Sequence, residues 1–279
     1  LKSTIEQGAL WSGLPRIMRR RHRGEILVLA YHNIVPTGEI VAGYRSLHLE
    51  QARFAAQLDA LMRTHDVIPL ERALASPASV RPAAVITFDD AYQGAVTAGV
   101  AELARRGLPA TIFVATGYLN GGDFWWDALT PPGAPGPAPA LRARALNEWQ
   151  GADTTIRAMA AREHLATQVS PPSHARGAPE SDLAAAAQVP GITFGSHTHS
   201  HPNLARLEDD TLQRELAHPL AWLRERFSNV LPMISYPYGL SSPAVERAAA
   251  HAGYTAAFRI EGGWLSRNAD NAFALPRLD

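Results

Sequence analysis

The sequence predicts an α/β fold built on a parallel sheet, and three observations lead to this prediction. Apolar runs of strand length recur along the chain, stretches with helical periodicity separate them, and polar residues follow where several of the apolar runs end. Strands that alternate with helices form parallel sheets, whose chemistry lies at the carboxyl ends of the strands. A chain of 279 residues can bury a full core, and no repeat or break in composition marks a second domain, so we expect one barrel-like domain.

The first part of the chain shows the alternation clearly. Residues 25–32 form a nearly continuous apolar run, which is typical of a central parallel strand. Residues 50–65 carry apolar side chains at helical spacing, which predicts an amphipathic helix that covers the barrel. A helix over 94–106 is expected to end at Gly107 and Pro109. Further strands are expected over 67–70, 83–90 and 110–116.

The alternation stops after Tyr118, and residues 118–181 are interpreted as an insertion into the barrel. Near its start, Trp125 and Trp126 either form a platform that stacks on a sugar ring or anchor the inserted segment on the core, and we favour the second interpretation. Two helices are expected within the insertion, over 141–150 and 153–168.

The alternation returns after the insertion. A helix over 209–227 contains Pro219, where a kink is expected. Ser242 and Pro243 provide an N-cap and a first-turn proline for a helix that continues to His251. Strands are expected over 233–238, 255–260 and 273–278, and the last two would close the barrel.

The balance of charges excludes some partners. Over the whole chain Lys plus Arg and Asp plus Glu number 26 each, so no overall field recruits nucleic acid or a membrane. The barrel-like domain is expected over residues 25–279. Residues 1–24 form a basic, amphipathic arm, which either contacts an anionic membrane or polysaccharide surface or packs as a helix on the outside of the barrel. The chain has no cysteine, which excludes disulfides and thiol ligands.

The sequence shows no apolar stretch near the ~20 residues of a membrane span and no secretory signal at its start. Because residue 1 is Leu, a processed or trimmed start is compatible with the sequence, and both a cytoplasmic and a cell-envelope location are left open.

The densest group of metal-binding residue types lies between Ile192 and Pro202. His197, His199 and His201 are three of the 11 histidines, and they directly follow an apolar run. If the chain makes one helical turn there, His197 and His201 share a face at i, i+4 and His199 points elsewhere; in an extended chain all three would line one side, and we prefer the turn. Imidazoles bind zinc and similar metals, so the stretch predicts a metal site, the alternative being a solvated polar loop.

A second apolar run, residues 83–90, ends in two adjacent carboxylates, Asp89 and Asp90. Neighbouring strand residues point to opposite faces, so these two can serve different roles at the carboxyl edge of the strand. One can hold a metal while the other takes a proton from water bound to that metal. Taken alone, an Asp-Asp pair is more typical of a helix N-cap, and it is the histidine stretch that favours a catalytic site.

Together these stretches resemble the motifs of the polysaccharide deacetylases, also called NodB homology proteins or carbohydrate esterase family 4. Residues 87–90 (Thr-Phe-Asp-Asp) match the first motif, residues 197–201 (His-Thr-His-Ser-His) the second and residues 234–239 (Ile-Ser-Tyr-Pro-Tyr-Gly) the third. The resemblance covers residues 25–118 and 180–279, and three motifs in order make it specific.

The resemblance implies a distorted (β/α)7 barrel and a set of roles. Asp90, His197 and His201 would hold a divalent metal, with Zn²⁺ expected first and Co²⁺ or Ni²⁺ as alternatives. Asp89 would be the general base, and the backbone N–H of Tyr238 would stabilise the oxyanion of the tetrahedral intermediate. Only the backbone of Tyr238 is implicated, so a change of its side chain should do little beyond disturbing local packing.

Two features depart from the commonest family pattern. No histidine follows His251, so the acidic histidine of a late motif is missing. Tyr31-His32 instead resembles the branch that deacetylates poly-N-acetylglucosamine, which implies that His32 is the general acid, the alternative being a hydrogen-bonded histidine at a strand end. Ser235 stands where many relatives have the arginine that orients the catalytic Asp, and Arg277 either supplies that charge or braces the barrel as a buried arginine.

The function expected from these features is metal-dependent hydrolysis of N-acetyl groups on a glycan, with a carbohydrate as the partner. An O-acetyl esterase or a deformylase would use the same site, and a catalytically silent carbohydrate-binding module is an alternative from another class. The sequence has no Gly-x-Ser-x-Gly elbow and no His-Glu-x-x-His pair, which argues against serine esterases and zincins. Neither the glycan nor the oligomeric state follows from the sequence.

Overall fold

The computed structural model describes residues 25–75, 82–165, 171–266 and 269–279. The basic arm predicted over residues 1–24 lies outside these ranges. Among the helices that are described, none combines the length and the apolar composition needed to cross a membrane.

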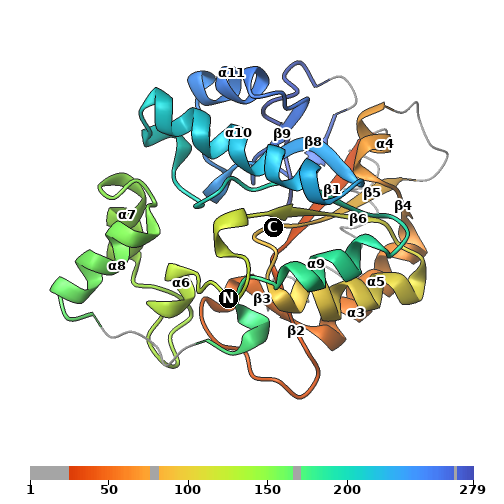
Figure 1. The fold of residues 1–279 in the computed structure, drawn as a ribbon. Helices are drawn as coiled ribbons and strands as arrows, with labels where there is room; N and C mark the ends of the chain where they lie inside the picture. The colour runs from red at the N-terminus through yellow and green to blue at the C-terminus, as the bar shows by residue number, and fades with distance from the viewer. Residues whose placement is uncertain (1–24, 76–81, 166–170, 267–268) are drawn as a thin grey trace.

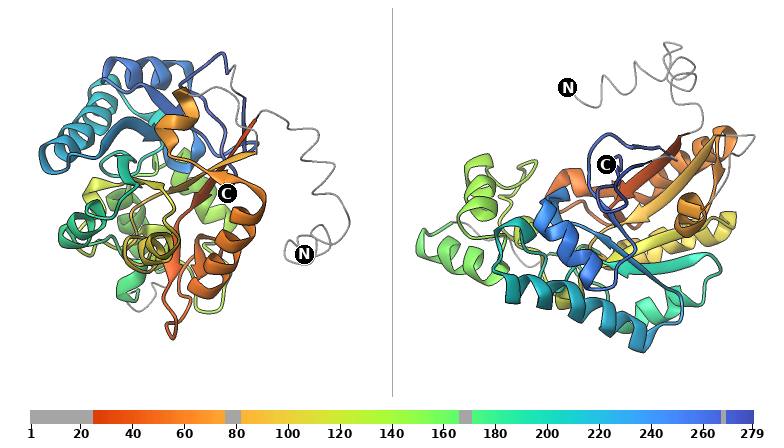
Figure 2. Two further views of the ribbon diagram at one scale, coloured as in Figure 1. Left: turned by 90° about the vertical axis from the view of Figure 1, so that its right-hand side faces the viewer. Right: turned by 90° about the horizontal axis from the view of Figure 1, so that it is seen from above.

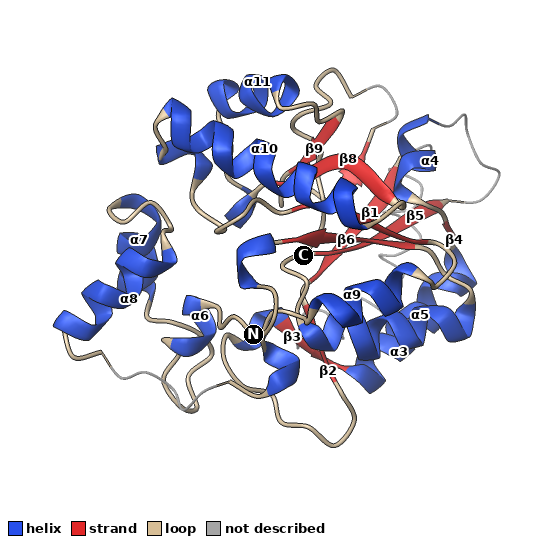
Figure 3. Cartoon of the chain, viewed as in Figure 1, coloured by secondary structure: helices blue, strands red, loops and turns tan. Residues whose placement is uncertain are grey.

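A curled sheet forms the centre of the molecule (Figures 1 and 3). Its strands are β1 (Ile26–Tyr31), β4 (Asp66–Val67), β5 (Ala83–Phe88), β6 (Ala110–Val114), β7 (Ile192–Ser196), β8 (Val230–Ser235), β9 (Ala256–Phe258) and β10 (Trp264–Leu265). The order is β10-β1-β5-β6-β7-β8-β9, with β4 beside the start of β5. All pairs are parallel except β1 with β10, so the predicted α/β barrel-like fold is confirmed. A separate parallel pair joins β2 (Asn33–Val35) and β3 (His48–Glu50).

Helices cover the outside of this sheet, as the two views of Figure 2 show. The α-helices are α3 (Gln51–Thr64), α4 (Leu70–Ala75), α5 (Val100–Arg106), α6 (Trp125–Ala128), α7 (Pro139–Asn147), α8 (Asp153–Arg162), α9 (Glu180–Ala187), α10 (Asp209–Arg226) and α11 (Pro243–His251). A π-helical stretch, η2 (Ala95–Gly99), precedes α5. Short 3-10 turns are η1 (Arg45–Leu47), η3 (Thr116–Tyr118), η4 (Ser173–Ala175), η5 (Leu204–Arg206) and η6 (Pro237–Gly239). In Figure 1, α6, α7 and α8 of the expected insertion stand to one side of the barrel.

Several predicted boundaries hold and others need correction. Ser242 caps α11 by accepting a hydrogen bond from the N–H of Val245, and α10 continues as one helix through Pro219. The strand predicted over 67–70 is wrong in extent, because Leu70 already begins α4.

The strand predicted over 273–278 is replaced by a segment that makes single bridges to two strands. The N–H of Leu275 donates to the oxygen of Ala257 in β9, at 2.9 Å. Three residues later, the N–H of Leu278 donates to the oxygen of Val28 in β1, at 2.8 Å. The segment therefore lies between the two ends of the parallel sheet and closes the barrel, which places Arg277 at the closure.

Side-chain alternation along the strands separates an interior core from an outer one. In β5, Ala84, Ile86 and Phe88 belong to the cluster under the helices, whereas Ala83 and Val85 belong to a second cluster. That second cluster receives side chains from strands all around the sheet, so it is the barrel interior. Its members include Ile26, Val28, Phe113, Met233, Ala256, Phe258 and Leu275.

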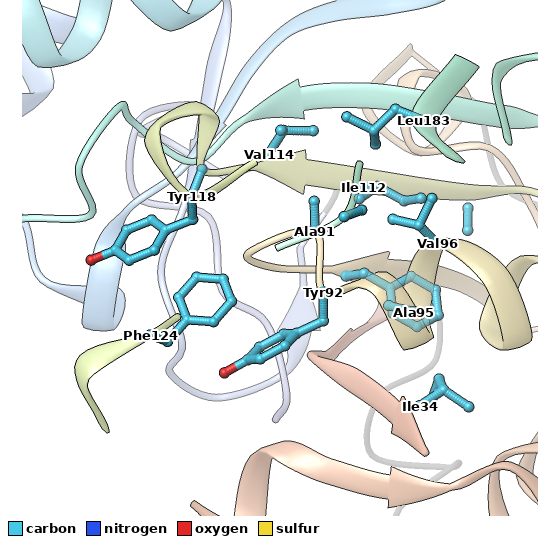
Figure 4. Packing of buried hydrophobic residues seen from close by; sticks show 14 of the residues in the cluster. Ile34, Ala91, Tyr92, Ala95, Val96, Ile112, Val114, Tyr118, Phe124 and Leu183 are labelled. Atoms are coloured by element: carbon cyan, nitrogen blue, oxygen red, sulfur yellow. The ribbon is translucent and has the colours of Figure 1, made fainter. Parts of the chain in front are cut away.

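The outer core includes a group of aromatic rings that connects the insertion to the barrel. Figure 4 shows Tyr92, Tyr118 and Phe124 close together beside β6 and η2. The ring centroids of Tyr92 and Phe124 are 4.4 Å apart, and those of Tyr118 and Phe124 are 4.5 Å apart and stacked. Aromatic pairs at these distances add to the stabilisation from burial, so the inserted segment is fixed to the barrel at its start.

Candidate active site

The period of two along parallel strands brings three predicted site residues to one place. Asp89 continues the interior-facing positions of β5, and His197 occupies the same position beyond β7. His32 directly follows β1 with the same alternation as Ile26 and Val28. These side chains all line one cavity of about 200 Å³ at the carboxyl ends of the strands.

Asp90, His197 and His201 present their ligand atoms to a common centre. The Nε2 atoms of the two histidines are 3.0 Å apart, and Oδ1 of Asp90 lies 3.4 Å from Nε2 of His197 and 3.3 Å from that of His201. Bonds of about 2.0–2.1 Å around a tetrahedral metal put neighbouring ligands about 3.3 Å apart, so this triangle fits such an ion with further positions open. Oδ1 of Asp90 is buried and accepts no hydrogen bond within the described residues, which is a second sign that a cation belongs there.

Burial controls the protonation of the three residues in the metal-free protein. Burial lowers the pKa of His197 to about 4 and holds the pKa of His201 well below its usual value, so both rings are neutral at pH 7, as a metal ligand must be. Burial also raises the pKa of Asp90 to about 8, a cost that a bound cation would offset. The Nδ1 atom of His197 lies 2.8 Å from the backbone oxygen of Ser235 and donates to it, which leaves Nε2 free to bind a metal.

The turn that brings the two histidines together is not the predicted helical turn. Thr198 and His201 both adopt left-handed backbone angles, with φ of 68° and 55°, and the Thr198 hydroxyl accepts a hydrogen bond from the N–H of His201 at 3.1 Å. The i, i+4 spacing therefore converges through a tight, irregular loop. His199 points away from the triangle, as expected, and its Nδ1 lies 3.0 Å from the hydroxyl of Thr116.

Arg277 forms a bidentate ion pair with Asp89 inside the barrel. Its Nη1 and Nη2 atoms lie 2.8 Å and 2.7 Å from the two carboxylate oxygens, and both side chains are fully buried. The hydroxyl of Ser235 donates to Asp89 at 3.0 Å, and Arg277 also donates to Thr87. Burial would raise the pKa of Asp89, but the Arg277 charge outweighs it and holds that pKa well below the usual carboxyl value.

His32 also lines the cavity, with Nδ1 3.4 Å from Oδ1 of Asp279. Burial lowers the pKa of His32. The contact with Asp279 and the nearby charges of Asp90 and Asp89 raise the pKa by more than burial lowers it, and the result is about 9. At neutral pH the ring is therefore protonated and able to donate a proton. His251 is exposed at the end of α11 and does not line the cavity.

Tyr238 has a constrained backbone at the edge of the cavity. Its φ of 60° lies in the left-handed region, and within the described chain its N–H donates no hydrogen bond. The ring packs edge-on against His201, with centroids 4.6 Å apart, and its hydroxyl accepts a hydrogen bond from Nε1 of Trp125 at 3.1 Å. The local packing of this side chain therefore includes a residue of the metal triangle.

Removing only the Tyr238 hydroxyl is expected to leave catalysis intact. Tyr238→Phe keeps the ring against His201 and the backbone conformation but leaves the Trp125 N–H without its acceptor. We expect a loss of about 1 kcal/mol in the free energy of unfolding. The resemblance implies a role for the Tyr238 backbone N–H alone, so kcat is expected to stay within about twofold of the wild type. Urea denaturation and steady-state kinetics test this, and a large fall in kcat with unchanged stability would assign the hydroxyl a direct role.

The two tryptophans are anchors rather than an exposed platform. Trp125 and Trp126 are only 1% and 4% exposed, and Trp126 packs on His201 with centroids 4.7 Å apart. The Nε1 of Trp126 donates to the hydroxyl of Tyr92 at 2.7 Å. Both still contribute to the cavity wall, whose remaining members beyond the site residues are Tyr44, Ser46, Leu47, Arg142, Ile260 and Asp279.

A buried polar network behind this wall was not predicted from the sequence. The carboxylate of Asp127 is fully buried and accepts hydrogen bonds from the Tyr92 hydroxyl at 2.6 Å and from the backbone N–H of Tyr44 at 2.7 Å. His48 Nε2 also lies 2.9 Å from Asp127. The network ties α6 to the loop of Tyr44, so it fixes two parts of the wall together. These residues are 35 to 83 positions apart in the sequence, and no motif marks them.

Comparison with known proteins agrees with this geometry. A family model described as polysaccharide deacetylase matches residues 78–257. A search of curated proteins found no significant match.

Three of the similar solved structures, each below 20% identical, show the same fold. The Streptococcus pyogenes deacetylase PplD in complex with acetate is 19% identical, with a TM-score of 0.61 and coverage of 91% of both chains. IcaB from Ammonifex degensii is 16% identical, with a TM-score of 0.64 and coverage of 92% of this chain and 93% of that one. The deacetylase domain of BpsB from Bordetella bronchiseptica is 15% identical, with a TM-score of 0.59 and coverage of 91% and 95%. The family model matches more than half of the chain, so the chain belongs to the polysaccharide deacetylase family.

Proposed function

We propose that the protein is a metal-dependent carbohydrate N-deacetylase, which hydrolyses the acetamido groups of an N-acetylated glycan. The observation that carries this proposal is the pairing, in one cavity, of the Asp90–His197–His201 triangle with a carboxylate, Asp89, kept ionised by Arg277. The similar deacetylase PplD was solved in complex with acetate, the acid that deacetylation releases, and this supports the proposal by analogy.

Asp90, His197 and His201 would hold the metal, preferably Zn²⁺, with Co²⁺ or Ni²⁺ as alternatives. When bound, a divalent metal lowers the pKa of a coordinated water and polarises an acyl carbonyl. Asp89 takes the proton from the attacking water, and Arg277 holds the Asp89 carboxylate in place through both of its oxygens.

The remaining roles belong to two other residues that line the cavity. The backbone N–H of Tyr238 donates to the oxyanion of the tetrahedral intermediate. His32, protonated at neutral pH, gives its proton to the leaving amine of the sugar. Its early position in the chain agrees with the resemblance to the branch that acts on poly-N-acetylglucosamine.

Removal of the metal is expected to abolish acetate release. Purified protein would be analysed for its elemental metal content and then assayed with N-acetylglucosamine oligomers before chelation, after chelation and after addition of Zn²⁺, Co²⁺ or Ni²⁺. We expect stoichiometric metal, loss of acetate release on chelation and its recovery on adding metal.

Other outcomes separate the alternatives. Acetate released from O-acetylated but not from N-acetylated oligomers would identify an esterase, and formate from N-formyl substrates a deformylase. Protein that holds no metal and binds the oligomers unchanged would contradict the proposal and indicate a carbohydrate-binding module.

A further inference from the structure

We propose that Glu215 is a positioning residue for the metal centre, because it holds the loop that carries His197 and His201. This inference rests on the metal site of the proposed function but concerns a residue outside all three sequence motifs. Glu215 lies in α10, and its hydrogen bonds go neither to the metal triangle nor to Asp89.

The hydrogen bonds of Glu215 all reach the middle of the histidine loop. Its Oε2 accepts hydrogen bonds from the backbone N–H groups of His199 and Ser200, each at 2.9 Å. Its Oε1 accepts a third from the hydroxyl of Ser200 at 2.6 Å. One carboxylate therefore satisfies three donors within two consecutive residues, between the two histidines of the triangle.

The burial and charge of Glu215 show that this contact matters energetically. The side chain is only 9% exposed, and among the described residues it forms no ion pair with any Lys, Arg or His. A buried carboxylate without a counter-charge is costly unless donors satisfy it, and hydrogen bonds to an ionised acceptor are stronger than neutral ones. The three hydrogen-bond donors of His199 and Ser200 thus compensate for the burial of the Glu215 carboxylate.

The loop needs an external support. Thr198 and His201 both occupy the left-handed region, and non-glycine residues there cost on the order of 1–3 kcal/mol each unless the surroundings enforce the conformation. The Thr198 hydroxyl acts only within the loop. The N–H groups of Thr116 and Gly117 donate to the oxygens of Thr198 and His199 and attach the loop to η3. Glu215 attaches it on another side to α10, whose Leu212, Leu216 and Leu220 are buried in the core beside β8. The loop that carries His197 and His201 is thereby anchored to a helix packed on the barrel.

The test is Zn²⁺ affinity, measured by competition with a chelating dye, for the wild type and for Glu215→Ala and Glu215→Gln. Direct hydrogen-bond partners of metal ligands are typically worth about 10–100-fold in affinity. Glu215 acts one step further out, through the loop backbone, so we expect Glu215→Ala to bind Zn²⁺ about tenfold more weakly, at the low end of that range. Glu215→Gln can still accept from the two backbone N–H groups but has lost its charge, and it should fall between Glu215→Ala and the wild type. Glu225→Ala, on the same helix with its side chain 75% exposed, is the matched control and should bind as the wild type does.

The thermal midpoint of each chelated variant separates positioning from general stability. A tenfold loss of Zn²⁺ affinity in Glu215→Ala and a smaller loss in Glu215→Gln, with unchanged midpoints in both, support the proposal. Equal Zn²⁺ affinity in wild type and Glu215→Ala overturns it, whatever the midpoint. Should Glu215→Ala fail to fold, Ser200→Ala, which removes one donor only, is compared instead and is expected to weaken Zn²⁺ binding severalfold. Wild-type protein that binds no Zn²⁺ would refute the metal site itself, an outcome distinct from failure of the Glu215 proposal.

Discussion

Asp89→Asn is expected to lower kcat on the order of 10³-fold while metal affinity stays within about threefold of the wild type, since a general base contributes about 10²–10⁴-fold to such reactions. The amide cannot take a proton from water, yet it keeps the size of the carboxylate and one oxygen for Arg277. Asp89 is not a member of the metal triangle, so the ligand set is untouched. Acetate release under saturating substrate and Zn²⁺ titration measure the two quantities.

A surface aspartate provides the matched control for this variant. Asp59 lies on α3, pairs with Arg106 and is half exposed, so Asp59→Asn should leave kcat within about twofold of the wild type, as exposed ion pairs contribute little. Near-normal turnover in Asp89→Asn would remove Asp89 from the role of base. Loss of both turnover and metal would instead assign it to the ligand set.

Arg277→Leu is expected to lower the free energy of unfolding by about 3–5 kcal/mol, the usual cost of leaving one partner of a buried ion pair alone. The variant leaves Asp89 charged in the barrel interior with only the Ser235 hydroxyl as a donor. Turnover should fall as well, because Asp89 loses the contact that orients it. Urea denaturation in the presence of chelator measures the stability effect without a contribution from bound metal.

Two further variants test whether the broken ion pair causes the stability loss of Arg277→Leu. Arg53→Leu removes an exposed arginine that pairs with Glu50 and should cost less than about 1 kcal/mol. The double variant Asp89→Asn/Arg277→Leu should be more stable than Arg277→Leu alone, since it no longer buries an unpaired charge. If the two changes simply add their costs, the ion pair does not account for the loss.

The pH dependence of this stability difference follows from the lowered pKa of Asp89. A carboxyl whose pKa is lowered by folding stabilises the protein above its unfolded pKa of about 3.9, and that contribution is lost as the pH falls. Without Arg277, Asp89 loses the charge that most favours its ionised form, so burial shifts its pKa upward, although His197 and His32 still act in the opposite direction. The gap between wild type and Arg277→Leu should therefore be widest near pH 7 and shrink as the pH falls below about 5. Denaturation curves across this range check the direction.

The sequence by itself predicted the fold class and pointed to the carboxylates and histidines that the structure brings into one cavity. The apolar runs of β1, β5, β6 and β7 are long enough to identify as buried strands, and polar residues at their ends mark the reactive edge of a parallel sheet. Neighbouring residues in the sequence also specified the start of α11, because an N-cap and a first-turn proline act within one turn of the chain.

The tertiary structure alone decided how distant residues complete the site. The sequence left two roles open for Arg277, and only the structure shows that it reaches Asp89, 188 positions away, because the final segment closes the barrel through single bridges rather than the expected strand. Glu215 and Asp127 hold the histidine loop and the cavity wall through buried hydrogen bonds to backbone and side-chain donors. Such contacts depend on where elements meet in space, whereas sequence periodicity reports only which face of each element is buried. The supports of the site are therefore visible only once the barrel has closed.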